Sequence, residues 1–344
     1  MRRIVMVLVT FAAAGVLAAS GRAPRNHGPL DSVTAHAAVP VPASQPDSLL
    51  WIEIRNVTMH LDEHATIRVR RLRGQVRSTS AGHPAILDDR GSFSIVVSSG
   101  TVGLTAEDLT TLLNEYVFSY RGAPLKKLRA RVEGGRVSLT GTMHKGVDLR
   151  FDITSEMSLT PEGMIRLHPT RTRILGVNGL KLMNALGLKL DDMLDLRGSR
   201  GASVKGNDIY LDPEKILPPP AIAGRLASAR VEGSEIAIEF VTTAEDSIFD
   251  AYVHADSVVP NYVYFRGAQL QFGKLLMSDT DLLIVDAEPS DPFDLNLQEY
   301  AKQLVAGTSH TLPNLGLRVE MPDYGSLGPG AVAGRSENVS RAPR

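Results

Sequence analysis

The chain has 344 residues, of which 43% are hydrophobic, and a formal net charge of −1 at pH 7. This length and composition provide enough apolar material for a sizeable core and exceed one average domain. The balanced charge and the 5% of aromatic residues argue against nucleic acid as a partner, because they supply neither a cationic surplus nor a platform for stacking bases.

The N-terminus has the layout of a secretory signal peptide. Met1-Arg2-Arg3 precedes an apolar run over 4–19, and small residues follow as far as Ala23. We therefore expect residues 1–23 to be cleaved on export into a bacterial periplasm. An uncleaved membrane anchor is the alternative, although the run falls short of the about 20 residues that cross a bilayer. The chain has no cysteine, so it has neither disulfides nor the residue that a lipid-anchored precursor needs.

Three regions follow the signal peptide. Residues 24–48 are rich in Pro and Ala, which predicts a disordered linker. Periodic patterns begin at Leu49 and predict a single folded domain over 49–324. The glycines, serines and arginines of residues 325–344 are typical of a disordered tail.

The clearest predicted strand covers residues 147–159. Apolar side chains, beginning with Val147, occupy every second position except Ser155, and polar side chains lie between them. A period of two over this length indicates a long β-strand with one apolar and one polar face. Further strands are expected over 51–55, 57–59, 66–70, 128–133, 136–143, 164–168, 202–211, 223–231, 235–241, 262–265 and 282–285.

Three helices are predicted between these strands. The first begins after Thr105, which can form a capping box with Asp108, and continues to about residue 118. A second is expected over 179–186. A third is expected to start at Asp291-Pro292 and to end at Gly307.

Long alternating strands with few helices predict an α+β fold in which a long, strongly curved antiparallel sheet wraps around one or two helices. Residues 52–57 are similar to residues 263–268, which suggests that both ends of the folded region extend one sheet. The concave face of such a sheet is apolar and must be covered by a helix, a second sheet or a lipid. The candidates for lining a lipid groove are Leu109, Leu112, Leu113, Tyr116, Val117, Leu149, Phe151, Ile153 and Met157.

One segment fits a catalytic pattern. His60-Leu61-Asp62-Glu63-His64 matches the H-x-x-E-H motif of inverted zincins, whose chemistry needs a helix. The flanking residues alternate as strands do, so the motif is expected at the end of a hairpin. On a strand, His60, Asp62 and His64 share one face and are candidates for a loosely held metal, whereas a solvated turn is the simpler interpretation.

Other catalytic patterns are missing from the sequence. No serine lies in a G-x-S-x-G elbow, Gly198-Ser199-Arg200-Gly201 lacks the lysine of a phosphate loop, and there is no thiol nucleophile. We therefore expect neither enzymatic activity nor a cofactor.

Basic residues recur on the predicted polar faces of the strands. A solvated outer face is the simpler interpretation, and peripheral contact with anionic membrane headgroups is the alternative. The basic residues concerned are Arg68, Arg70, Arg71, Arg73, Lys126, Lys127, Arg129, Arg131, Arg171 and Arg173.

Residues 101–240 contain turn and strand motifs that resemble the LmeA-like phospholipid-binding family of bacterial exported proteins. This resemblance implies a tubular, TULIP-like architecture, in which a curved sheet wraps round a helix and leaves an apolar groove for acyl chains. It implies no catalytic residues, and it does not extend over 241–324. The motifs that carry it are Leu139-Thr140-Gly141-Thr142, Val147-Asp148-Leu149-Arg150-Phe151, Leu159-Thr160-Pro161-Glu162-Gly163, Gly206-Asn207-Asp208-Ile209-Tyr210-Leu211-Asp212-Pro213 and Leu217-Pro218-Pro219-Pro220.

Three hypotheses about function follow. The first is an exported protein that holds or transfers a phospholipid or similar amphiphile in the cell envelope. The second is a structural or interaction module of the envelope whose groove is filled by its own side chains. The third is a metal-dependent hydrolase that uses His60, Glu63 and His64.

Overall fold

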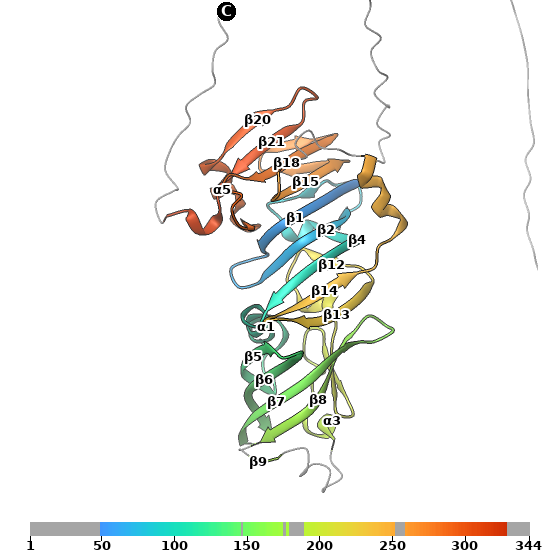
Figure 1. Cartoon of the computed structure of the whole chain (residues 1–344), viewed down its shortest axis with the longest axis vertical. Helices are drawn as coiled ribbons and strands as arrows, with labels where there is room; N and C mark the ends of the chain where they lie inside the picture. The colour runs from blue at the N-terminus through green and yellow to red at the C-terminus, as the bar shows by residue number, and fades with distance from the viewer. Residues whose placement is uncertain (1–48, 146, 175–176, 179–188, 252–258, 329–344) are drawn as a thin grey trace, which may run out of the picture. The chain divides into compact units, whose positions relative to one another are not determined.

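A computed structural model describes residues 49–145, 147–174, 177–178, 189–251 and 259–328. The described chain consists mostly of antiparallel strands with a few short helices, and its sheet curls into a half-barrel (Figure 1). The predicted α+β class with a strongly curved antiparallel sheet is therefore confirmed.

Eleven strands form the largest sheet. They are β1 (Leu50–His60), β2 (Thr66–Ser78), β4 (Phe93–Thr105), β12 (Ala221–Ala223), β13 (Leu226–Glu232), β14 (Glu235–Phe240), β15 (Tyr262–Gly267), β18 (Thr280–Asp286), β19 (Phe293–Asn296), β20 (Thr308–Thr311) and β21 (Leu317–Met321). Their order is β13-β14-β4-β2-β1-β15-β18-β21-β20, while β12 pairs with β4 and β19 pairs with β1. We call this the eleven-stranded sheet.

A second sheet has seven strands. They are β5 (Leu125–Glu133), β6 (Arg136–Lys145), β7 (Val147–Leu159), β8 (Ile165–Ile174), β9 (Val177–Asn178), β10 (Ala202–Lys205) and β11 (Asp208–Leu211). Their order is β10-β11-β8-β7-β6-β5, with β9 paired to β8, so that β5 is an edge strand. A small third sheet contains β3 (Ala85–Ile86), β16 (Leu270–Phe272) and β17 (Leu275–Met277).

The helices are short. The α-helices are α1 (Ala106–Leu112), α3 (Leu190–Met193), α4 (Pro213–Ile216) and α5 (Tyr300–Ala306). A π-helical turn, η2 (Leu113–Val117), continues α1, and 3₁₀ turns are formed by η1 (Arg90–Ser92), η3 (Ala244–Ala251) and η4 (Tyr324–Ser326). In the part of the chain that the structure describes, none of these helices has the length and apolar character needed to cross a membrane.

The two ends of the folded region meet in the eleven-stranded sheet. β1 pairs antiparallel with β15, and Ile52 lies opposite Phe265. The strands near the start and near the end of the folded chain therefore lie side by side, as Figure 1 shows.

The long strand and the hairpin before it agree with the sequence predictions. β7 has the predicted bounds, and its inward side chains Phe151 and Ile153 are buried. Gly134 and Gly135 join β5 to β6 with φ angles of +57° and +75°, which suit the tight turn that two glycines favour. Val147 departs from the pattern. It is the first residue after the turn between β6 and β7, and 62% of its surface is exposed.

The predicted start of the first helix is also confirmed. The Thr105 hydroxyl accepts a hydrogen bond from the Asp108 backbone N–H, and the Asp108 carboxylate accepts one from the Thr105 N–H. This reciprocal capping box satisfies two backbone donors that a helix otherwise leaves unpaired.

The predicted helix from Asp291 is wrong over its first half. Residues Phe293–Asn296 form the strand β19, which pairs parallel with the end of β1, and the helix α5 begins only at Tyr300. The Asn296 side chain accepts hydrogen bonds from the backbone N–H groups of Gln298 and Glu299, which turns the chain between strand and helix. Gly307 ends the helix as predicted. The helix predicted over 179–186 lies outside the described residues.

Several strands show no clear signal in the sequence. β4 is the longest of them, and the run Ser98-Ser99-Gly100 interrupts its apolar alternation. It nevertheless pairs with β2 along most of its length and with β12 and β14 on its other edge.

One hydrophobic cluster extends through both large sheets. It includes Ile52 and Ile67 of the eleven-stranded sheet, Phe151 of the seven-stranded sheet and Leu112 of α1. The two sheets therefore share a core rather than enclosing separate ones.

Candidate apolar binding site

The residues predicted to line a lipid groove all belong to this shared core. Six of the nine are buried members of the hydrophobic cluster, and the other three are partly buried and pack against it. Leu109, Leu112, Leu113, Val117, Phe151 and Ile153 are buried, and Tyr116, Leu149 and Met157 are partly buried.

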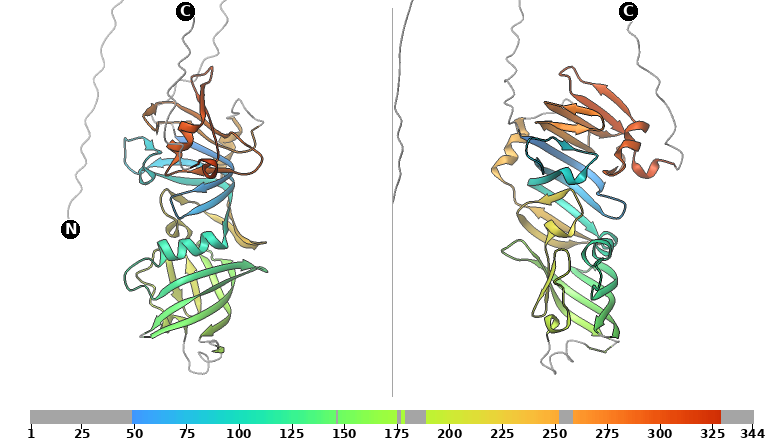
Figure 2. Two further views of the ribbon diagram at one scale, coloured as in Figure 1. Left: turned by 90° about the vertical axis from the view of Figure 1, so that its left-hand side faces the viewer. Right: turned by 180° about the vertical axis from the view of Figure 1, so that it is seen from behind.

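The helix of this predicted groove does not lie directly on β7. α1 lies along β5, the edge of the seven-stranded sheet, and β6 separates β5 from β7 (Figure 2). The helix and the strand that the sequence analysis paired are thus separated by β5 and β6 in the sheet, and their buried side chains belong to the same core.

Side chains of the helix complete the hydrogen bonding of the β5 edge. The Asn114 amide donates to the Leu128 carbonyl at 2.8 Å, and its oxygen accepts from the Leu128 N–H at 3.0 Å. The Thr110 hydroxyl accepts from the Ala130 N–H at 2.9 Å. Backbone groups that an edge strand would leave unpaired are satisfied in this way.

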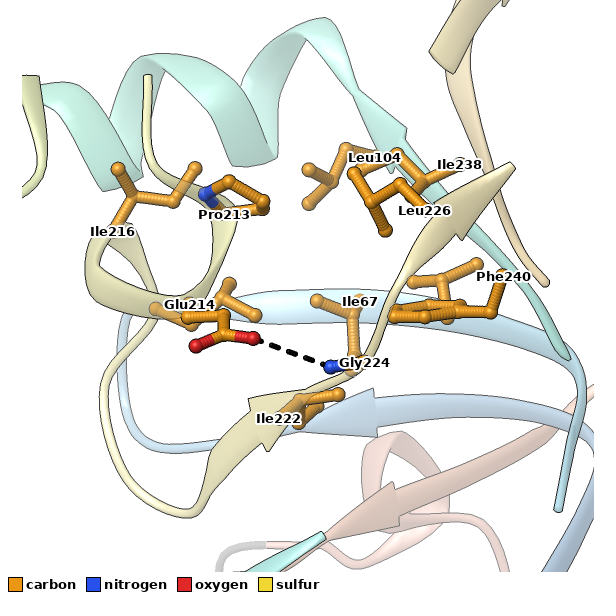
Figure 3. A pocket seen from close by; sticks show the side chains of 12 residues that line it. Ile67, Leu104, Pro213, Glu214, Ile216, Ile222, Gly224, Leu226, Ile238 and Phe240 are labelled. Atoms are coloured by element: carbon orange, nitrogen blue, oxygen red, sulfur yellow. Dashed lines mark hydrogen bonds between the residues drawn. The ribbon is translucent and has the colours of Figure 1, made fainter. Parts of the chain in front are cut away.

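An apolar cavity lies elsewhere, beside the edge of β4 (Figure 3). Its volume is about 30 Å³, which is about the space that one water molecule occupies in the liquid. Glu214 is the one charged residue in the lining. The lining residues are Ile67, Val102, Leu104, Pro213, Glu214, Ile216, Leu217, Ile222, Gly224, Leu226, Ile238 and Phe240.

The cavity arises where β4 changes partners. β12 runs parallel to residues 94–96 of β4, whereas β14 runs antiparallel to residues 100–105. Gly224 lies in the segment that connects β12 to β13, and Leu226 is the first residue of β13. A Cβ atom on Gly224 would lie 2.9 Å from the Phe240 ring, so only glycine fits beside that ring without a shift.

A larger open cleft adjoins the cavity. The cleft has a volume of about 870 Å³ and is formed by the β7–β8 turn, the start of α4 and the segment around Arg225. Four residues line both spaces, namely Pro213, Glu214, Gly224 and Leu226. We call these four residues the mouth of the cavity.

Polar groups surround the mouth. The Glu214 carboxylate accepts a hydrogen bond of 3.3 Å from the Gly224 N–H, and Figure 3 shows this contact at the wall of the cavity. The Lys215 ammonium lies 2.6 Å from the Asp212 carboxylate. The apolar cavity therefore borders a polar surface that carries charges of both signs.

Sequence reasoning missed this cavity, although it singled out part of it. Pro213 and Leu217 lie in two of the motifs that carry the family resemblance, but neither was assigned to a groove. Most of the remaining lining residues come from β2, β4, β12, β13 and β14, and no local pattern links these strands.

The H-x-x-E-H segment lies at a hairpin end, as predicted, between β1 and β2. His60 Nε2 is hydrogen-bonded to Asp294 Oδ1 at 2.6 Å, and the Thr66 hydroxyl lies 3.3 Å from His60 Nδ1. Both ring nitrogens therefore have partners other than the rest of the motif. In the described part of the chain, no group of three or more His, Cys, Asp or Glu side chains is placed to hold a metal ion.

Asp62 of the same segment anchors the hairpin to the helix. Its carboxylate accepts hydrogen bonds from the Tyr116 hydroxyl at 2.5 Å and from the backbone N–H groups of His64 and Ala65, both at 2.9 Å. Burial alone would raise the pKa of Asp62, but these hydrogen bonds and the Arg90 charge outweigh it and hold the pKa below its usual value. The arrangement is that of a structural anchor for the loop.

No protein-family model, curated protein or solved structure matches this chain. The resemblance to the LmeA-like family therefore stays a prediction from the sequence motifs.

Proposed function

We propose that this protein binds a phospholipid or a similar acyl-chain amphiphile, and that it does so in the bacterial cell envelope to which its N-terminal sequence is expected to direct it. The apolar end of the ligand would enter the cavity beside β4, and the polar end would remain in the adjoining cleft. This places the ligand in a different position from the groove expected between the first helix and β7.

The observation that supports this proposal is the junction of an apolar cavity with an open, polar cleft at a shared mouth. A ligand site typically combines an apolar lining with a few placed polar groups, and the cleft of about 870 Å³ falls in the usual range of about 300–1,000 Å³. Each Å² of apolar surface that leaves water contributes roughly 25 cal/mol. A few methylene groups in the cavity would therefore add measurable affinity.

The ligand must widen the cavity as it enters, because about 30 Å³ admits only the end of a chain. The mouth is suited to such a change. Glu214 is exposed, and its bond to the Gly224 N–H is long. Breaking a bond of this kind costs about 1 kcal/mol or less when water can replace the partner. Displacement of Glu214 and rotation of Leu226 would open the cavity to the cleft.

Binding can be tested with delipidated, refolded protein and a fluorescent fatty acid or phospholipid. We expect saturable binding by the wild type. Leu226→Trp should fill the mouth and weaken binding at least tenfold. Leu113→Trp is the matched control, because Leu113 is equally buried but lies in the expected groove rather than at the mouth. Overpacking should cost each variant a similar amount of stability, about 1–3 kcal/mol.

The two variants separate the two sites. Loss of binding in Leu113→Trp alone would place the ligand in the groove first expected from the sequence. No saturable binding by the wild type would overturn the proposal for both sites. Mass spectrometry of lipids that co-purify with the protein would identify the bound class.

A structural or interaction module is the second candidate function. It is favoured by the burial of the expected groove residues in the core and by the small volume of the cavity. A protein of this kind should bind no acyl-chain probe, and its cavity variants should lose only stability.

A further inference from the structure

The outer face of the seven-stranded sheet carries three rows of cationic side chains. Residues directly opposite each other on neighbouring strands share a face. One row reads Arg131-Ser138-Thr154-Arg171, the next Arg129-Thr140-Asp152-Arg173, and the third Lys126-Thr142-Arg150. Each row thus begins and ends with a cation, and the side chains between them carry hydroxyl groups, except Asp152 in the second row.

We call this surface the basic face. It consists of six exposed cations and a single carboxylate, that of Asp152, which lies 3.5 Å from Arg171. Its cations are Lys126, Arg129, Arg131, Arg150, Arg171 and Arg173. The rows on either side carry paired charges: His144 with Asp148 at 2.7 Å, and Arg136 with Glu156 at 3.7 Å.

The basic residues of the eleven-stranded sheet are different, because most of them have anionic partners. Arg73 lies 3.0 Å from Glu53, and Arg70 lies 3.0 Å from Glu232 and also contacts Glu235. These pairs cancel much of the positive charge that the sequence alone assigned to that sheet.

Most cations of the basic face lack such partners. Among the described residues, Arg129, Arg131, Arg150 and Arg173 have no carboxylate within ion-pair distance. The positive charge of this surface is therefore available to an external anionic partner, whereas that of the other sheet is largely used within the protein.

We propose that the basic face docks the protein on an anionic lipid surface. The cations come from β5, β7 and β8, which lie together with β6 in one sheet (Figure 1), so that several cations can approach one surface together. Val147 lies three residues before Arg150 of the third row, paired with Lys145 at the turn of the β6–β7 hairpin, and 62% of its surface is exposed. An exposed apolar side chain at this end of the sheet suits the boundary between headgroups and acyl chains.

The surface fits lipid headgroups better than a nucleic acid. Serine and threonine hydroxyls can donate hydrogen bonds to phosphate oxygens, but no aromatic side chain lies in the three rows to stack on a base. This inference goes beyond the proposed function, because docking requires the basic face and not the cavity.

Docking can be measured by co-sedimentation with vesicles. The full chain should bind vesicles of phosphatidylcholine mixed with anionic phosphatidylglycerol, and it should not bind phosphatidylcholine alone. The double variant Arg129→Gln/Arg131→Gln should bind roughly 30-fold more weakly, about fivefold for each cation removed. Binding should also weaken from 0.1 M to 1 M salt, where the screening length falls from about 10 Å to about 3 Å.

The matched control is Arg55→Gln/Arg71→Gln. These two exposed arginines lie opposite each other on the eleven-stranded sheet, so the control removes the same charge from the other sheet. It should bind as the wild type does. Equal loss in both double variants, or wild-type binding by Arg129→Gln/Arg131→Gln, would overturn the assignment of docking to the basic face.

Two further outcomes decide the nature of the partner. Binding to a soluble polyanion such as heparin, without sedimentation with anionic vesicles, would overturn the lipid surface as the partner. Leu226→Trp should dock normally even if it no longer takes up an acyl-chain probe, so that failure of the cavity and failure of the basic face can be told apart.

Discussion

Replacing Asn114 by alanine should detach the helix from the edge of the seven-stranded sheet. The Asn114 side chain makes three hydrogen bonds, one to the Thr110 carbonyl and two to the backbone of Leu128. Leu128 is 3% exposed, so its N–H and carbonyl have little access to water once the amide is gone. Other residues of β5 cannot replace these contacts, because β6 pairs with the opposite edge.

The expected loss follows from these two backbone groups. A buried donor or acceptor that loses its partner costs about 1–3 kcal/mol. Two such groups would cost about 2–6 kcal/mol, and the better helix propensity of alanine returns roughly 0.5 kcal/mol. Because Asn114 is itself only partly buried, water can reach part of the site, and we expect a net loss of about 2–3 kcal/mol in the free energy of unfolding.

Equilibrium unfolding in urea measures this loss, and Glu115→Ala is the control. Glu115 is the exposed neighbour of Asn114 in the same π-helical turn, and its replacement should change stability by less than about 0.5 kcal/mol. Hydrogen exchange should show a faster-exchanging Leu128 amide in Asn114→Ala. A change below about 0.5 kcal/mol with an unchanged Leu128 exchange rate would refute the role of the side chain at this edge.

Three further predictions concern the strand, the hairpin and the N-terminus. Phe151→Asp should cost several kcal/mol or prevent folding because it puts a charge in the core, while Arg150→Asp should cost little; equal losses of thermal stability would contradict the alternation of β7. The pKa of Asp62 is lower in the folded protein than the unfolded value of about 3.9, so its ionised form stabilises the fold above that pH. This stability is lost as the pH falls through the folded pKa, so the difference in stability between wild type and Tyr116→Phe should shrink below about pH 4. A difference that stays constant with pH would exclude the hydrogen bond from Tyr116 as a cause of the lowered pKa. The mature protein should begin within residues 21–24 and occur in the periplasmic fraction, as N-terminal sequencing can show; a chain recovered from membranes with Met1 intact would favour the uncleaved anchor.

Local sequence patterns predicted the secondary-structure elements that are determined by neighbouring residues. The alternation of β7, the glycine turn before β6 and the capping box at Thr105 each depend on residues close in sequence. In all three, the residues that set the pattern also fix the element, through side-chain burial in β7, a positive φ at the two glycines and hydrogen bonds in the capping box.

The predicted helix at Asp291 failed because a distant strand competes for the same residues. Phe293 has helical spacing with Leu297 and Tyr300, yet it lies in β19 beside Val57 of β1. Phe293 is fully buried in this position. Burial against β1 thus outweighs a local preference that is worth only a few tenths of a kcal/mol per residue.

The cavity could not be predicted from local patterns for a related reason. It depends on the point where β12, which is parallel to β4, gives way to β14, which is antiparallel, and the ladder on this edge is interrupted between Val96 and Gly100. A parallel and an antiparallel strand cannot continue each other, so side chains such as Phe240 and Leu226 must fill the space between them. The volume that these side chains leave empty depends on their shapes, which a periodic sequence pattern does not reveal. A substitution at Leu226 therefore tests whether this residual space takes up a ligand, whereas one at Leu113 tests the groove that the local patterns suggested.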